Sequence, residues 1–116
     1  MPVNVSIVRV IVSVADLERA LGFYRDLIGL PATLSPGFAH LVLDGGVDLM
    51  LHERPSVASD TSVAISLGVP DLDTLCSRWE AVGGEVVDAP ATQPWGERMA
   101  VVRDADGHLV CLVARP

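Results

Sequence analysis

The chain has 116 residues, of which 50% are hydrophobic and 20% charged, enough apolar material for one folded domain and too much for a disordered segment. Lys and Arg total 8 against 15 Asp and Glu, and the formal net charge of -7 argues against binding to nucleic acids, whose phosphates are also negative. No apolar run approaches the ~20 residues that cross a bilayer. The two cysteines, Cys76 and Cys111, lie in apolar runs, which favours buried thiols in a reducing compartment. We therefore expect a cytoplasmic protein with no membrane partner.

The first half of the chain predicts the element order βαβββ. Residues 3–14 (VNVSIVRVIVSV) are rich in β-branched residues and predict a strand. Asp16 can cap a helix over residues 17–28, because its carboxylate can accept hydrogen bonds from the free amides of the first turn, and Gly29 is a natural left-handed stop. Three further strands are expected at residues 32–34, 38–43 and 47–52, with a turn at Asp44–Gly45–Gly46.

The second half repeats this order. Asp16 matches Asp71 and Gly29 matches Gly84 at one constant offset along the chain, whereas Gly46 matches Gly107 at a larger offset because the second half has a longer loop. Such a repeat indicates duplicated modules that bury a common core. The expected elements are a strand at 62–69, a helix at 72–82, and strands at 85–87, 97–103 and 109–114.

Two loops stand out between these elements. Residues 89–96 (APATQPWG) form a Pro-rich loop that carries Trp95, which is either a ligand lid or a plug over the core. Residues 55–61 (PSVASDT) are short and polar, as in a flexible linker. We therefore expect one domain, 1–116, made of module 1 (about 1–54) and module 2 (about 62–116).

Several motifs resemble the vicinal oxygen chelate superfamily, which includes glyoxalases, bleomycin resistance proteins and extradiol dioxygenases. Residues 14–20 (VADLERA), 22–26 (GFYRD) and 28–30 (IGL) resemble its first-helix signature. Trp95–Gly96 and residues 103–108 (RDADGH) resemble its final hairpin, with Ala105 in place of the usual proline. The resemblance spans about residues 5–113. It implies an α+β fold in which two tandem βαβββ modules form a cupped mixed sheet with helices on the outer face.

In metal-dependent members of that superfamily, four His, Gln or Glu residues on the strands bind a divalent ion. The corresponding positions here are Arg9, Met50, Ala64 and Cys111. Arg cannot coordinate an ion and Ala has no donor atom. The resemblance therefore implies a protein with no metal and no cofactor.

Strand alternation divides the side chains between two faces of the sheet, because residues two apart share a face. One face is apolar and is expected to pack on the helices: Val8, Val10, Val12, Leu49, Leu51, Val63, Ile65, Leu67, Val110 and Leu112. The other, the cup face, is mostly apolar with a few polar groups, as in a small-molecule pocket. Its expected members are Arg9, Ile11, Ser13, Phe38, His40, Val42, Asp48, Met50, His52, Ala64, Ser66, Arg98, Ala100, Val102, Cys111 and Val113.

The polar groups of the cup face have alternative interpretations. An unpaired Arg9 would be costly in an apolar strand, so it either pairs with Asp48 or another carboxylate or meets an anionic ligand group. His40 and His52 are candidates for acid or base catalysis, or are structural. His108 is expected to lie at the surface or to support the hairpin.

These observations favour a metal-free small-molecule binding protein of the bleomycin-resistance type, with a role in antibiotic resistance, that sequesters an apolar or partly cationic ligand. The expected ligand-binding residues are Arg9, Phe38, His40, Met50, His52, Ser66, Trp95, Arg98 and Cys111. The alternative is a glyoxalase- or dioxygenase-like lyase or isomerase with a displaced metal site or a metal-free His base. A third possibility is a non-catalytic dimer module whose cup is simply core. A homodimer is expected, because members of the superfamily usually pair modules across chains.

Overall fold

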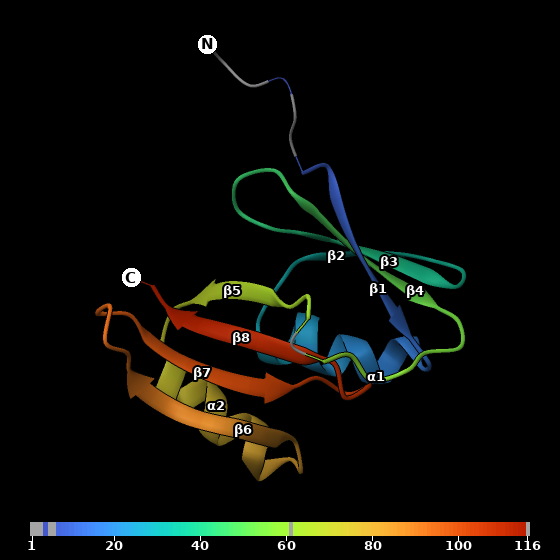
Figure 1. The fold of residues 1–116 in the computed structure, drawn as a ribbon. Helices are drawn as coiled ribbons and strands as arrows, with labels where there is room; N and C mark the ends of the chain where they lie inside the picture. The colour runs from blue at the N-terminus through green and yellow to red at the C-terminus, as the bar shows by residue number, and fades with distance from the viewer. Residues whose placement is uncertain (1–3, 5–6, 61, 116) are drawn as a thin grey trace. The chain divides into compact units, whose positions relative to one another are not determined.

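Each half of the chain folds as a four-stranded mixed sheet, and in both halves a helical segment connects the first strand to the second (Figure 1). The computed structural model describes residue 4 and residues 7–60 and 62–115. Two compact units form, one up to Ser56 and the other from Val57 onward. The predicted fold class, α+β with two tandem βαβββ modules, is confirmed.

The first unit has the strand order β1-β4-β3-β2. β1 pairs in parallel with β4, and the other pairs are antiparallel. Its core contains Leu41, Leu49, Leu51, Phe23 and Tyr24, all fully buried. Its elements are β1 (Arg9–Val14), α1 (Leu17–Leu21), η1 (Gly22–Leu27), β2 (Ala32–Ser35), β3 (Phe38–Val42) and β4 (Asp48–Glu53).

The second unit repeats this topology with the order β5-β8-β7-β6. Its helix contacts β6, β7 and β8, and Leu72, Leu75 and Cys76 are buried on it. Its elements are β5 (Ile65–Val69), α2 (Leu72–Ala81), β6 (Glu85–Thr92), β7 (Arg98–Arg103) and β8 (Leu109–Ala114). Among the described residues, no helix is long and apolar enough to cross a membrane.

Both first strands are shorter than expected. β1 begins at Arg9, and of the residues predicted to precede it in the strand, 3, 5 and 6 lie outside the described residues. β5 begins at Ile65, where its parallel pairing with β8 starts. The side chain of Val63, before this point, is 85% exposed.

The predicted helix over residues 17–28 is correct in place but only its first turn is α-helical. From Gly22 the chain widens into the π-helix η1, in which the Ile28 amide donates to the Phe23 carbonyl at 3.0 Å. In η1 both rings are fully buried and meet edge to face, with centroids 4.8 Å apart.

β6 is longer than the predicted strand over residues 85–87. It continues through Thr92 into the segment expected to be loop, and its register against β7 shifts twice, between Val86 and Asp88 and again between Asp88 and Ala91. Such bulges let extra residues remain in a strand. Because β6 is an edge strand, Pro90 costs no bond to a second neighbour.

The two helix-capping aspartates differ. The Asp16 carboxylate accepts from the Arg19 amide at 3.2 Å, as predicted. Asp71 precedes α2 in the expected position but makes no side-chain capping bond, and its φ of 57° lies in the left-handed region. The predicted capping role of Asp71 is therefore wrong for its side chain.

This difference predicts opposite effects of two substitutions. Asp16→Ala removes a capping bond and should lower the free energy of unfolding by about 1 kcal/mol. Asp71→Gly relieves the left-handed backbone strain and should raise the free energy of unfolding by up to about 1 kcal/mol. Urea unfolding of both variants provides the measurement, and an equal loss of stability in the two would contradict the assignment.

Candidate functional site

The strand register of the first unit places the expected residues on its cup face. Arg9 lies opposite Asp48, and Met50 lies between Ile11 and His40. His52 lies between Ser13 and Phe38 in the next row. A slip of two residues along β4 would bring His52 to the position of Met50, and the observed pairing places Met50 where the hairpin predicted it.

A polar cluster forms on this face around Asp48. Its Oδ2 accepts from the Arg9 Nε at 2.8 Å and lies 2.7 Å from the His40 Nδ1. Of the two partners predicted for Arg9, a carboxylate or a ligand, the structure places the carboxylate of Asp48 there. The Arg9 guanidinium, followed by the bond to His40, holds the pKa of Asp48 below its usual range. The rings of Phe38 and His40 meet nearly at right angles, with centroids 5.4 Å apart.

Asp48 also determines which nitrogen of His40 carries a hydrogen. An ionised carboxylate only accepts hydrogen bonds, so Nδ1 is the donor and the Nε2 of a neutral ring is an acceptor. A His–Asp pair of this kind has the chemistry of a general base or of a structural hydrogen bond.

In the second unit the register confirms part of the expected cup face and corrects the rest. Cys111 lies opposite both Ser66 and Val101. Ala100 and Val102 lie opposite Leu112 and Val110, so they share the helix-packing face and are buried.

Arg98 is likewise on the helix-packing face of β7. Its guanidinium donates to both carboxylate oxygens of Asp73 on α2, at 3.0 and 2.6 Å. The predicted place of Arg98, Ala100 and Val102 on the cup face is therefore wrong. The offset that relates Gly46 to Gly107 also matches His40 in β3 to Val101 in β7. Because residues two apart share a face, the cup face of β7 carries Met99, Val101 and Arg103.

The four positions that the resemblance assigns to a metal site do not fit a divalent ion. In the structure Arg9 is bound to Asp48, Ala64 is exposed before β5, and Met50 and Cys111 offer only soft sulfur donors. Across residues 7–60 and 62–115, no three His, Cys, Asp or Glu side chains gather as a metal site would require.

The internal repeat shows that the two cup faces have opposite character. Arg9 corresponds to Ala64 at the offset that relates Asp16 to Asp71. His40 and Asp48 correspond to Val101 and Leu109 at the Gly46–Gly107 offset. Each polar member of the cluster in the first unit is thus replaced by an apolar residue in the second. By the same offset Met50 corresponds to Cys111, and both are half-buried.

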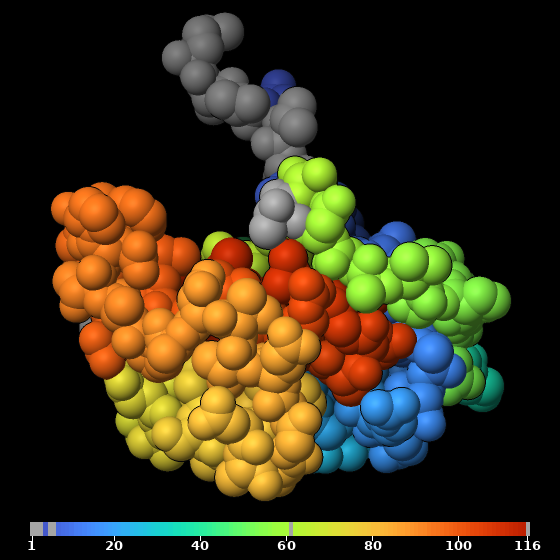
Figure 2. Space-filling view, turned by 60° about the horizontal axis from the view of Figure 1, so that its bottom comes forward, coloured from blue at the N-terminus to red at the C-terminus, as the bar shows by residue number. Residues whose placement is uncertain are grey.

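A pocket of about 550 Å³ opens in the second unit between β6, β7 and their connection. The orange residues of this region stand out from the surface of the unit in Figure 2. The lining is mostly apolar, with one carboxylate and one amide, as in many small-molecule sites. Its residues are Val87, Asp88, Ala89, Ala91, Gln93, Trp95, Met99, Ala100 and Val101.

An insertion builds this pocket. The offset between the modules is larger at Gly107 than at Gly84, and the extra residues therefore lie between these two glycines. The first unit, which lacks them, pairs β2 with β3 over Ala32–Ser35 without a register shift. The bulges of β6 and the β6–β7 connection hold the extra length, and we call the resulting cavity the insertion pocket.

Trp95 stands at the rim of the insertion pocket with 65% of its surface exposed. Its indole N–H donates to the Glu97 Oε1 at 2.8 Å, and the other oxygen of Glu97 lies 3.4 Å from Arg115. These contacts hold the edge of the indole. Of the two roles predicted for Trp95, a lid or a plug over the core, its exposure and its place at the rim favour the lid.

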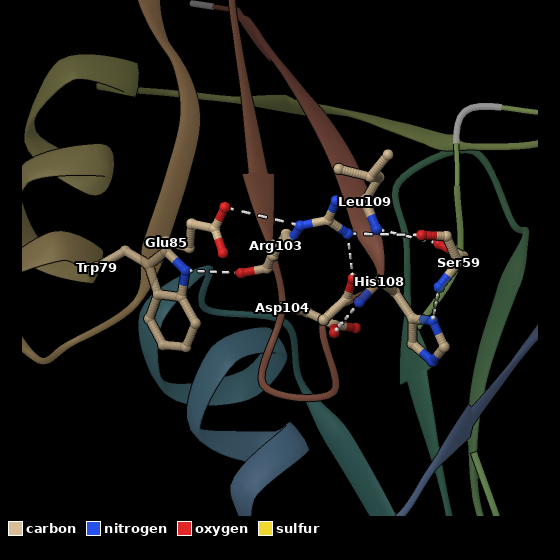
Figure 3. Close-up of polar contacts among 8 residues, drawn as sticks. Ser59, Trp79, Glu85, Arg103, Asp104, His108 and Leu109 are labelled. Atoms are coloured by element: carbon tan, nitrogen blue, oxygen red, sulfur yellow. Dashed lines mark hydrogen bonds and ion pairs between the residues drawn. The ribbon is translucent and has the colours of Figure 1, made fainter. Parts of the chain in front are cut away.

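A serine, a histidine and an aspartate meet at the base of the β7–β8 hairpin (Figure 3). The Ser59 amide donates to the His108 Nδ1 at 3.1 Å, and the Ser59 Oγ accepts from the Leu109 amide at 3.0 Å. The Asp104 carboxylate accepts from the His108 amide at 2.9 Å. His108 thus contacts the backbone of Ser59 and not its hydroxyl, which is not the geometry of a catalytic triad.

The same network extends to β6 through Arg103, whose Nη1 donates to the Gly107 carbonyl at 2.7 Å and whose Nε lies 3.7 Å from Glu85. Figure 3 shows the Arg103 guanidinium lying between Glu85 and the Ser59 segment. His108 supports the hairpin, as predicted. The linker, expected to be flexible, is hydrogen-bonded to the second unit at Ser59.

The sequence matches the family described as the Glyoxalase/Bleomycin resistance protein/Dioxygenase superfamily over residues 6–112. The chain belongs to this superfamily. No curated protein matches the sequence significantly.

Solved structures share the fold. A glyoxalase-related enzyme from Fulvimarina pelagi is 21% identical with a TM-score of 0.81, over 96% of this chain and 88% of that one. A superfamily member from Sphaerobacter thermophilus DSM 20745 is 26% identical with a TM-score of 0.74, over 96% and 98%. A glyoxalase/bleomycin resistance protein from Catenulispora acidiphila DSM 44928 is 29% identical with a TM-score of 0.67, over 94% and 97%. Each covers nearly the whole chain, so both units belong to the shared fold.

The cluster at Asp48 predicts a specific pH dependence. Because the folded pKa of Asp48 is lowered, its ion pair stabilises the fold above the unfolded value of about 3.9, and this stabilisation is lost as the pH falls through the folded pKa. Arg9→Gln should raise the pKa of Asp48 toward its ordinary value, as followed by NMR titration of the side-chain carboxyl carbon.

Arg98→Gln is the matched control. It should raise the pKa of Asp73, which the Arg98 guanidinium lowers, and leave Asp48 unchanged. If the pKa of Asp48 were unchanged in Arg9→Gln, Arg9 would not be the dominant partner of Asp48.

Proposed function

We propose that this protein is a metal-free small-molecule binding protein of the bleomycin-resistance type, acting in the cytoplasm as a homodimer and serving antibiotic resistance by sequestration. The observation that carries the proposal is the insertion pocket. The extra residues of the second module lie in the segment that lines an open pocket of about 550 Å³, within the usual range of small-molecule sites.

The lining of the insertion pocket favours binding over catalysis. A catalytic site needs a nucleophile or base next to a group that orients it. The lining has one carboxylate, on Asp88, and one amide, on Gln93, among apolar residues. Apolar walls with a few polar groups fix a ligand by contact area and orientation, which suits a protein that holds its ligand unchanged.

The residues in the family's metal positions support the metal-free part of the proposal, because they offer an ion neither oxygen nor imidazole ligands. The free thiols of Cys76 and Cys111 are consistent with a reducing cytoplasm. Burial raises the pKa of the Cys76 thiol, which leaves it protonated and unreactive.

The second candidate is an enzyme of the lyase or isomerase type in which His40 acts as a base without a metal. The bond from His40 to Asp48 favours it, since the carboxylate leaves Nε2 free to accept a proton. Arg9 would hold an anionic group of the substrate, but its Nε is already bonded to Asp48. The other two nitrogens of the Arg9 guanidinium would then have to bind the anionic group of the substrate.

Metal analysis and ligand recovery separate these proposals. Protein purified from its native host without chelators should carry no near-stoichiometric Fe, Mn, Ni or Zn. Mass spectrometry should detect a co-purified small molecule that is unchanged after prolonged incubation with fresh protein. Bound metal that disappears in His40→Ala or His52→Ala would contradict the metal-free proposal.

Conversion of the co-purified molecule into a product would support the enzyme instead. His40→Gln should then abolish the conversion while Trp95→Phe retains part of it. For sequestration in the insertion pocket, we expect that both variants release the molecule unchanged. Trp95→Phe should bind it more weakly, and His40→Gln should bind it as tightly as the unmodified protein.

A further inference from the structure

Asp88 gives the insertion pocket its charge. The bulge in β6 sets Asp88 opposite Val101, on the cup face, and its carboxylate is the single charged group in the described lining. The pocket therefore has one negative charge in apolar walls and no positive charge to balance it.

Two other carboxylates of the same unit pair with arginines. Asp73 pairs with Arg98 at 2.6 Å, and Glu97 lies 3.4 Å from Arg115. The side chain of Asp88 makes no hydrogen bond or ion pair with the other described residues. The net charge of the chain, -7, also favours the approach of a cation over that of an anion.

Trp95 adds an aromatic surface beside this charge. Its indole N–H is bonded to Glu97, which leaves the faces of the ring for stacking. A cation over the face of an indole is attracted by the ring quadrupole, and Trp is the strongest aromatic partner in this respect. The Met99 side chain, also in the lining, provides a polarisable wall that adapts to flat rings.

We propose that the insertion pocket binds an organic cation with a flat apolar body, its charge near Asp88 and its ring against Trp95. This inference rests on the proposed function and specifies its ligand class. It makes Asp88 the residue that determines charge selectivity. The second unit would provide the binding site, and the polar cluster at Asp48 in the first unit would take no part in it.

Three planar probes of similar size test the charge selectivity. They are 1-methylquinolinium, a permanent cation; quinoline, neutral at pH 8; and 1-naphthoate, an anion. NMR titration of the intact protein gives an affinity for each and shows which amides, and whether the indole N–H of Trp95, respond. The cation should bind most tightly and the anion most weakly, and added salt should weaken only the cation's binding, because screening acts on charge.

Substitutions assign the effect to single residues. Asp88→Asn, which keeps the shape of the side chain, should weaken binding of 1-methylquinolinium about three- to fivefold, as expected for a solvent-exposed charge pair, and leave quinoline unchanged. Asp44→Asn, in the exposed β3–β4 turn of the other unit, makes the same change in net charge and should alter neither. Trp95→Ala should weaken both probes.

The outcomes distinguish the two proposals. Equal binding of cation and neutral probe in the insertion pocket, with no effect of Asp88→Asn, would overturn the inference about charge and leave a small-molecule binding protein. Equal losses in Asp88→Asn and Asp44→Asn would overturn it as well, because the preference would then come from net charge. If no probe altered the resonances of Trp95 or Met99, both the cation inference and the proposed use of this pocket would fail.

Discussion

The register of two hairpins determines which side chains reach each face of the molecule. Val42 pairs with Asp48 across the turn at Gly46, and Arg103 pairs with Leu109 across the turn at Gly107. Both glycines have positive φ, 88° and 85°, a conformation that other residues adopt only at a cost. Because a slip of one residue would turn every side chain of a strand to the opposite face, the cluster at Asp48 and the lining of the insertion pocket both depend on these turns.

The two units use one backbone plan for different chemistry. In the first unit the cup face holds Arg9, His40 and Asp48 in hydrogen-bond contact. The corresponding positions of the second unit carry Ala64, Val101 and Leu109. Polar groups on a partly buried face are tolerated where they form hydrogen bonds with one another. When one of them is replaced by an apolar residue, the others lose their partners, which favours replacement of all of them. A duplicated module can thus keep the cluster complete in one copy and replace it with apolar surface in the other.

Much of the fold could be predicted from the sequence because its signals are local. Gly29 correctly marked the end of the first helical segment, and the Asp44–Gly46 turn correctly separated β3 from β4. The repeat predicted the topology of the second unit from the first. The π-helix that begins at Gly22 could not be predicted, because the apolar periodicity of a helix does not distinguish a single wider turn from an α-helical one. The long β6 was missed because Pro90 usually indicates a loop.

The candidate site was predictable only in its first half. The alternation of β3 and β4 was sufficient to place His40, Met50 and Asp48 on one face. In the second unit Arg98 was assigned to the wrong face, because β7 was not aligned through the Gly46–Gly107 offset. Asp88 was missed because a bulge decides which way it points. The change in offset between the modules was visible in the sequence, and it marks the segment that forms the insertion pocket.

The extra residues of the second module lie at a place where the sheet tolerates a change of length. Edge strands tolerate extra residues because only one neighbour constrains them, and β6 is the edge strand farthest from β5 in its sheet. The central strands β7 and β8 keep the offset of the final hairpin and bury Val102, Val110 and Leu112. The core can therefore stay fixed while β6 changes length and sequence. A protein whose ligand is defined by such an edge can alter its specificity at residues such as Asp88 without loss of stability, whereas a site built on the central strands would couple the two.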